Sequence, residues 1–327
     1  MCAHPTHPSA EARLRAADGR GRLLFVGGLF CDMVFADAEL PEPGGETFAA
    51  HFAFSPGGVA NRAVAAARLG VPTSLVSVAG DDPLGALALQ ALRDEEGLDT
   101  SGVAVLPGRQ TAITVSLSGE HDRSFITYEE PEVAVTPDDG SYAAAHLSVA
   151  GELPGWAGAL RNSGTTLVGG VGWDASEMWS SDVLRRLSDV DVFVPNEIEA
   201  MRYTGAQDAL TAARGLAEYV PLAIVTRGRK GAVAADSASG RLVEVPGIEV
   251  PAVDPTGAGD VFVGSFMASA LHEWDLETRL RFACLCAASS VTRVGGSISA
   301  PRPDDLRRLI EHRHLDGDWS FLSSLSE

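Results

Sequence analysis

The stretch DPTGAGDVFVGSFMASALHEW, residues 254–274, joins a glycine-rich turn directly to a helical pattern. Its apolar residues recur at helical spacing and predict one buried helix face: Val263, Phe266, Met267, Ala270, Leu271 and Trp274. Gly257 and Gly259 let the backbone turn tightly ahead of this helix. We therefore expect the amides of Gly257, Ala258 and Gly259 to point outward at the helix N-terminus, where they form a site for an anion.

Asp260 follows this turn and falls in the first turn of the expected helix. A carboxylate beside an anion site suits phosphoryl transfer to an alcohol, because it accepts the hydroxyl proton while the amides stabilise the transferred group. The motif alone leaves a second interpretation open, in which the aspartate only caps the helix.

Short apolar runs alternate with helical stretches along the chain from residue 22 onward. The runs are Leu23–Gly28, Thr73–Ala79, Thr165–Val168, Val190–Val194 and Leu222–Thr226. They are typical of strands buried on both faces of a parallel sheet. Between them, Asp82 and Pro83 predict a helix start and Gly97 its end. The alternation predicts a doubly wound α/β fold over residues 21–327, preceded by a flexible tail at residues 1–20.

Two segments, about 44–56 and 109–130, alternate polar and apolar residues instead. Residues 118–121 between two such runs are typical of a hairpin turn. We expect a small antiparallel sheet that projects from the main one. The alternative is that these segments are edge strands of the main sheet.

Composition excludes several classes of protein. The 327 residues carry 44 acidic and 25 basic side chains, a net charge of −19, which disfavours nucleic-acid and anionic membrane partners. The single lysine, Lys230, fits neither a Walker A loop nor the lysine strand of protein kinases. Four cysteines without metal or disulfide spacing, and no signal peptide or long apolar run, favour a cytoplasmic protein.

Four further motifs are weak alone. Gly57 and Gly58 precede a helix that carries Asn61, and Asp32 follows the first predicted strand, where α/β proteins bind ligands. Asn196 caps a helix after another strand, and Glu199 one turn later suits Mg²⁺ held through water, although the same spacing fits a capping box. Thr226, Gly228 and Gly231 form a glycine-spaced loop that admits a nucleotide, or alternatively a plain hairpin.

In this order, the motifs resemble the ribokinase (PfkB) family of carbohydrate kinases over about residues 22–315. The resemblance implies a ribokinase-like α/β fold, with a mostly parallel sheet flanked by helices and a small β-sheet lid. It implies transfer of the γ-phosphoryl of ATP to a sugar hydroxyl, with Mg²⁺. By this resemblance Asp260 is the base, and the anion hole is formed by Gly257, Ala258 and Gly259. The implied substrate-binding residues are Asp32, Gly57, Gly58 and Asn61. The implied nucleotide-binding residues are Asn196, Thr226, Gly228 and Gly231, and Glu199 is the implied Mg²⁺-binding residue.

The resemblance also implies a monovalent cation, often K⁺, near Asp254 and Thr256, with the backbone of Arg293, Gly295 and Ser299. Three departures from the family pattern concern the substrate: Pro255 in place of threonine, Phe30 where ribokinases commonly have asparagine, and a shorter spacing from Gly58 to Asn61. We expect a homodimer through the lid. Two alternatives remain: a nucleoside kinase with a base pocket built from Phe48, Phe52, Phe54 and Phe125, and a regulatory homologue that binds ligand without turnover.

Overall fold

The computed structural model describes residues 21–38, 41–118, 123–174 and 176–325. The chain divides into two compact units. Unit 1 contains residue 21, Ser141–Gly247 and Ala270–Arg281, whereas unit 2 contains Arg22–Gly140, Ile248–Ser269 and residues 282–325. The expected tail at residues 1–20 and most of the expected turn at 118–121 lie outside the described residues.

Unit 2 has parallel strands in the order β1-β4-β5. These are β1 (Arg22–Val26), β4 (Thr73–Gly80) and β5 (Leu98–Leu106). The helices of this unit are α2 (Val59–Arg68), α3 (Pro83–Arg93), α8 (Ala258–Ser269) and α10 (Pro303–Arg313), with the end of α9 (Leu276–Ser290) and the short turns η3 (Ser297–Ser299) and η4 (Ser320–Ser324). Residues 23–26 of β1 are all buried, as the continuous apolar run predicted, and only the first residue of the strand, Arg22, is exposed.

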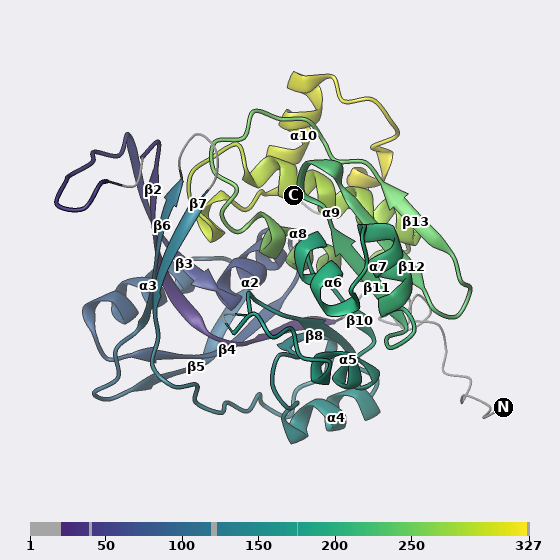
Figure 1. The fold of residues 1–327 in the computed structure, drawn as a ribbon, viewed down its shortest axis with the longest axis horizontal. Helices are drawn as coiled ribbons and strands as arrows, with labels where there is room; N and C mark the ends of the chain where they lie inside the picture. Colours follow the sequence, from purple (N-terminus) through teal and green to yellow (C-terminus); the bar gives the residue numbers. More distant parts are fainter. Residues whose placement is uncertain (1–20, 39–40, 119–122, 175, 326–327) are drawn as a thin grey trace. The chain divides into compact units, whose positions relative to one another are not determined.

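A second sheet of unit 2 has the order β3-β2-β6-β7 and fits the expected lid (Figure 1). Its strands are β2 (Leu29–Ala36), β3 (His51–Gly58), β6 (Ala112–Ser118) and β7 (Arg123–Tyr128). β2 pairs antiparallel with β3 and parallel with β6. The predicted segment 44–56 is therefore strand only from His51, and the sheet gains β2, which the sequence analysis did not predict.

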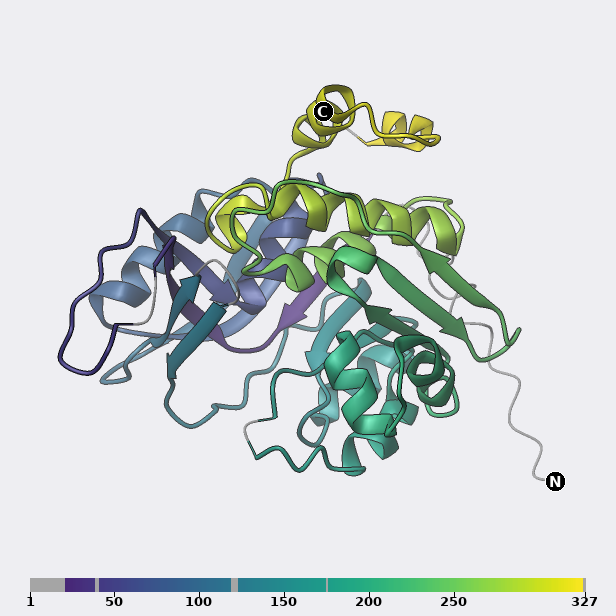
Figure 2. The same ribbon diagram turned by 45° about the horizontal axis from the view of Figure 1, so that its top comes forward.

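Unit 1 has strands in the order β13-β12-β11-β10-β9-β8. They are β8 (Tyr142–Ser148), β9 (Thr166–Gly170), β10 (Val192–Phe193), β11 (Leu222–Thr226), β12 (Ala232–Asp236) and β13 (Leu242–Val245). β8 to β11 run parallel, whereas β12 and β13 add an antiparallel hairpin, drawn in green in Figure 2. The helical elements are α4 (Gly155–Asn162), α5 (Asp182–Arg186), η1 (Leu187–Asp189), α6 (Glu197–Thr204), α7 (Ala209–Leu216) and η2 (Gly228–Lys230).

Helix α8 differs from its prediction in length and burial. It ends at Ser269, whose hydroxyl donates to the Phe266 carbonyl, and so it stops short of residue 274. Every residue from Val261 to Ser269 is buried, so the helix is covered on all sides and not on one face. The N-terminus of α3 confirms its prediction, because Asp82 accepts from the N–H groups of Leu84 and Gly85.

The fold is therefore α/β, with mostly parallel strands, flanking helices and a separate four-stranded sheet. Among the described residues, no helix has both the length and the apolar character needed to cross a membrane.

Candidate active site

Asp260 lies in the first turn of α8, with 23% of its side chain exposed. Its Oδ1 atom forms an ion pair with Nη2 of Arg62 at 2.7 Å. Its Oδ2 atom accepts from Nδ2 of Asn61 at 3.2 Å. Both partners come from the first turn of α2, so two neighbouring residues hold the two oxygens of one carboxylate.

The turn before α8 exposes its backbone to solvent. Gly257 has φ +75°, and a Cβ there would lie 3.0 Å from Cα of Gly296, so only glycine fits without strain. Gly259 is exposed, and a Cβ added to it meets open space. The N–H of Ala258 donates to the Pro255 carbonyl at 3.2 Å. A ligand therefore has access to this turn, although the Ala258 amide also closes the turn itself.

We expected Asp32 to follow the first strand. In the structure Asp32 instead lies within strand β2. Its residue is 6% exposed and pairs with Ser55 of β3. Gly57 lies two residues further along β3, and a Cβ on it would overlap the Asp32 carboxylate. The sheet therefore places a buried carboxylate against bare backbone, which requires glycine at position 57.

The surroundings of Asp32 raise the pKa of its carboxyl from 3.8 to about 7. Burial is the largest cause, followed by the charge of Asp260, while a hydrogen bond from Asn61 lowers the pKa and the charge of Asp254 raises it. Asn61 is itself 3% exposed, and its Oδ1 has no hydrogen-bond partner among the residues that the structure describes. Asp32, Asp254, Asp260 and Asn61 form an acidic cluster, in which the Asn61 amide lies between the carboxyls of Asp32 and Asp260.

Phe30 lies on the same face of β2 as Asp32, because the two residues are two positions apart. It pairs with Gly57, and its ring lies where a side chain on Gly58 would point. The ring therefore lies against the backbone of Gly28 and Gly58, so residue 30 acts directly on the glycine segment that precedes α2.

The residues expected near a monovalent cation lie in one loop cluster of unit 2. Asp254 is 1% exposed, and its oxygens accept from the backbone N–H groups of Thr256 and Gly295, both at 2.9 Å. The Ser299 hydroxyl donates to the Gly296 carbonyl at 2.7 Å, and its own carbonyl accepts from Arg293 at 3.2 Å. The expected residues are thus joined by backbone and side-chain hydrogen bonds.

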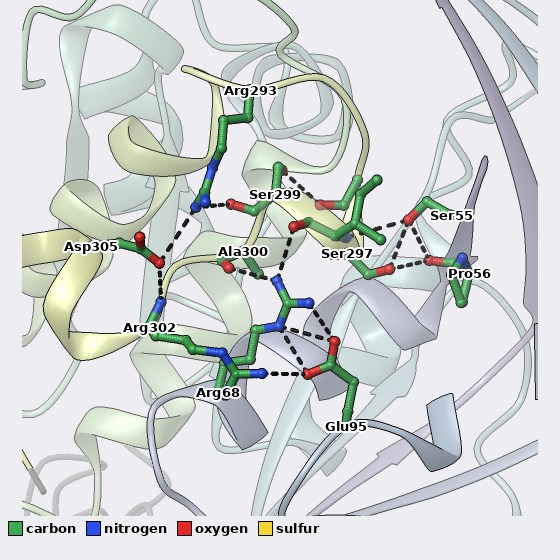
Figure 3. Close-up of polar contacts among 12 residues, drawn as sticks. Ser55, Pro56, Arg68, Glu95, Arg293, Ser297, Ser299, Ala300, Arg302 and Asp305 are labelled. Atoms are coloured by element: carbon green, nitrogen blue, oxygen red, sulfur yellow. Dashed lines mark hydrogen bonds and ion pairs between the residues drawn. The ribbon is translucent and has the colours of Figure 1, made fainter. Parts of the chain in front are cut away.

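Figure 3 shows how this loop is attached to its surroundings. Arg68 of α2 donates to the carbonyls of Ile298 and Ala300 at 3.0 and 2.8 Å, and it pairs with Glu95, which also pairs with Arg302. The Ser297 hydroxyl lies 2.7 Å from that of Ser55 in β3. These contacts fix the backbone of residues 297–300 against α2 and the four-stranded sheet.

The expected nucleotide residues lie in unit 1. Asn196 caps α6, and its backbone N–H donates to Oε2 of Glu199 at 2.9 Å, which completes a capping box. Asn196 also forms a β-bridge with Thr226 at the end of β11. Gly228 is the first residue of η2 and Gly231 directly follows it, and their φ angles are +54° and +87°. The capping-box interpretation of the Asn196–Glu199 spacing is therefore present in the structure, and Glu199 is buried.

The structure thus brings Asp32, Gly57, Gly58, Asn61, Asp254 and residues 256–260 together in unit 2, and Asn196, Glu199, Thr226, Gly228 and Gly231 together in unit 1. The sequence analysis missed Arg62. Its position directly after Asn61 was a usable signal, but the contact with Asp260 joins residues almost 200 positions apart.

Comparisons with known proteins find a family model, related sequences and solved structures of the same fold. The family model described as pfkB family carbohydrate kinase matches residues 21–303. Ribokinase of Haemophilus influenzae is 28% identical over 314 residues, covering 90% of this chain and 99% of that protein. Fructokinase-1 of Zea mays is 30% identical over 334 residues, with 90% and 99% covered. Among solved structures, a candidate ribokinase II from E. coli in complex with ATP and Mg²⁺ has a TM-score of 0.73 at 21% identity, covering 90% of this chain and 100% of that one.

Proposed function

The chain belongs to the pfkB family of carbohydrate kinases and is an ATP-dependent carbohydrate kinase, and we propose that Asp260 is the base that accepts the proton of the sugar hydroxyl. The observation that carries this proposal is the position of Asp260 in the first turn of α8, directly after an accessible glycine turn. As the hydroxyl oxygen attacks the γ-phosphorus, its proton passes to the carboxylate, and ADP leaves.

The turn at residues 257–259 supplies the anion hole. Backbone N–H groups at the start of α8 stabilise negative charge on the transferred phosphoryl group, and the helix dipole acts in the same direction. Since the Ala258 N–H closes the turn with Pro255, we assign the larger share to Gly257 and Gly259.

Asp32, Gly57, Gly58 and Asn61 bind the sugar. An ionised Asp32 accepts hydrogen bonds from sugar hydroxyls, and Asn61 both donates and accepts. The bare backbone at Gly57 leaves room for the Asp32 carboxylate itself. Phe30 supplies an aromatic ring where ribokinases commonly have the polar amide of asparagine. We therefore propose that the sugar directs fewer polar groups toward residue 30 than ribose does.

The unit 1 residues Asn196, Thr226, Gly228 and Gly231 bind ATP. Glu199 holds Mg²⁺ through water, which suits the preference of this ion for carboxylate oxygen and water ligands. When bound, Mg²⁺ neutralises charge on the phosphates of ATP.

We also propose a K⁺ site at the loop cluster of Asp254, Thr256, Arg293, Gly295 and Ser299. The buried carboxylate of Asp254 supplies the negative charge of this site, and the backbone carbonyls of Arg293, Gly295 and Ser299 are the further ligands that we propose. A homodimer through the four-stranded sheet is a further proposal. Exposed apolar side chains on β7, which are Phe125, Ile126 and Tyr128, support it.

One experiment tests the function. The purified protein is incubated with MgATP and a panel of pentoses, hexoses and nucleosides, in K⁺ and in Na⁺ buffer, and ADP release is measured. We expect one sugar to be phosphorylated best, and faster with K⁺. Preference for a nucleoside would instead support the second candidate, for which the exposed rings of Phe48, Phe52 and Phe125 are the relevant surface. Absence of turnover with the whole panel would support a regulatory role.

A further inference from the structure

Arg62 carries a cationic group into the acidic cluster around Asp260. It pairs with Oδ1 of Asp260 at 2.7 Å, and its side chain is 21% exposed. The other charged groups of this cluster are the carboxyls of Asp32 and Asp254, and the charges of Asp260 and Asp254 both raise the pKa of Asp32. The guanidinium is therefore the cation that offsets the proposed base.

The position of Arg62 is set by the packing of two helices. A Cβ on Gly264 of α8 would clash with the Arg62 carbonyl and approach Cβ of Ala65 to 3.0 Å. Gly264 lies one turn after Asp260, and Ala65 lies one turn after Asn61 and Arg62. The small residues at 264 and 65 therefore let α2 and α8 approach closely, and this approach places the first turn of α2 beside the carboxylate.

The two oxygens of Asp260 have different surroundings. Oδ1 receives the short ion pair from Arg62, whereas among the described residues Oδ2 accepts the longer 3.2 Å bond from Asn61. Oδ2 thus lies on the side of the proposed sugar-binding residues. A carboxylate held at one oxygen presents the other in a fixed direction, and catalysis depends on such positioning.

We propose that Arg62 is a positioning residue of the kinase reaction: it holds Oδ1 of Asp260 so that Oδ2 accepts the hydroxyl proton. This inference rests on the proposed function, because it presumes that Asp260 is the base. Arg62 acts through Asp260 and not on the sugar or the nucleotide. Its loss is therefore expected to lower kcat and to leave both KM values nearly unchanged.

The test compares R62Q, R62K and D260N with the wild-type enzyme, with R93Q on the exposed end of α3 as a matched control for loss of one arginine charge. Steady-state kinetics use MgATP and the best sugar of the panel. We expect R62Q to lower kcat about 10- to 100-fold with KM within about twofold. R62K keeps the charge but lacks the planar fork, so its kcat is expected to lie between those of R62Q and the wild type. R93Q is expected to match the wild type.

Two results would overturn the inference. One is an R62Q kcat within twofold of the wild type. The other is a loss in R62K equal to that in R62Q and accompanied by higher KM for the sugar, which shows that Arg62 acts as a structural residue. D260N distinguishes the proposed base from the proposed role of Arg62. If D260N turns over at the wild-type rate, Asp260 is not the base. If D260N is inactive and R62Q is fully active, only the role of Arg62 is contradicted.

Discussion

Replacement of Asp32 by asparagine tests the acidic cluster through the pH dependence of stability. The carboxyl of Asp32 has an ordinary pKa of 3.8, which the fold raises to about 7, mainly by burial and by the charge of Asp260. The folded state therefore binds this proton more tightly than the unfolded state does. The stabilising contribution is fully present below pH 3.8, decreases as the pH rises, and is lost once the pH passes about 7.

The size of the effect follows from the same values. A pKa difference of about 3 corresponds to about 4 kcal/mol, since one pH unit is worth about 1.4 kcal/mol. At pH 5 the wild type has lost about 1.5 kcal/mol of this contribution, and at pH 8 all of it. D32N carries no titrating group at this position. Its free energy of unfolding is therefore expected to rise relative to the wild type by about 3 kcal/mol between pH 5 and pH 8.

The assay is urea unfolding of D32N and the wild type at both pH values, without sugar, followed by tryptophan fluorescence. D139N provides the control, because Asp139 is exposed and the substitution removes the same charge. We expect the difference between D139N and the wild type to stay constant with pH. If the difference between D32N and the wild type also stays constant to within about 0.5 kcal/mol, Asp32 does not have the raised pKa on which the argument depends.

Three further predictions concern ligand binding. The KM for the sugar is expected to fall as the pH rises from 6 to 8, because the ionised form of Asp32 accepts hydroxyl hydrogen bonds; a KM independent of pH in this range would argue against that role. G57A is expected to raise this KM at least about 10-fold, because the added Cβ overlaps the Asp32 carboxylate, whereas a Cβ added in G158A on the exposed side of α4 meets open space and is expected to leave the KM unchanged. E199Q is expected to raise the Mg²⁺ concentration for half-maximal activity about 10-fold in a titration at fixed ATP; an unchanged midpoint would assign Glu199 to the capping box with Asn196 alone.

Local patterns predicted the elements whose signals lie close together in the sequence. The parallel strands β1, β4 and β11 follow continuous apolar runs, and the caps at Asp82 and Asn196 lie within three residues of the helix N–H groups that they accept from. The position of Asp260 in a first helical turn follows from the glycine spacing before it. In each case the determining contacts are local.

The four-stranded sheet shows where local patterns are insufficient. The apolar residues of β1 and β2 are separated only by Gly27 and Gly28, so the sequence suggests one strand and a loop. In the structure the chain leaves the parallel sheet at these glycines and pairs with β3 and β6, of which β6 begins about 80 residues later. This pairing places Asp32 inside a strand. Likewise, the contact of Arg62 with Asp260 depends on the close approach of α2 and α8, which no local pattern encodes.

The turnover of D260N with MgATP and the best sugar is the most direct test of the central claim, which is that Asp260 accepts the hydroxyl proton. The substitution keeps the size of the side chain and removes its ability to take a proton. We predict that kcat falls on the order of 10²- to 10⁴-fold while the unfolding midpoint stays near that of the wild type. A D260N enzyme that folds normally and turns over at nearly the wild-type rate would contradict the account.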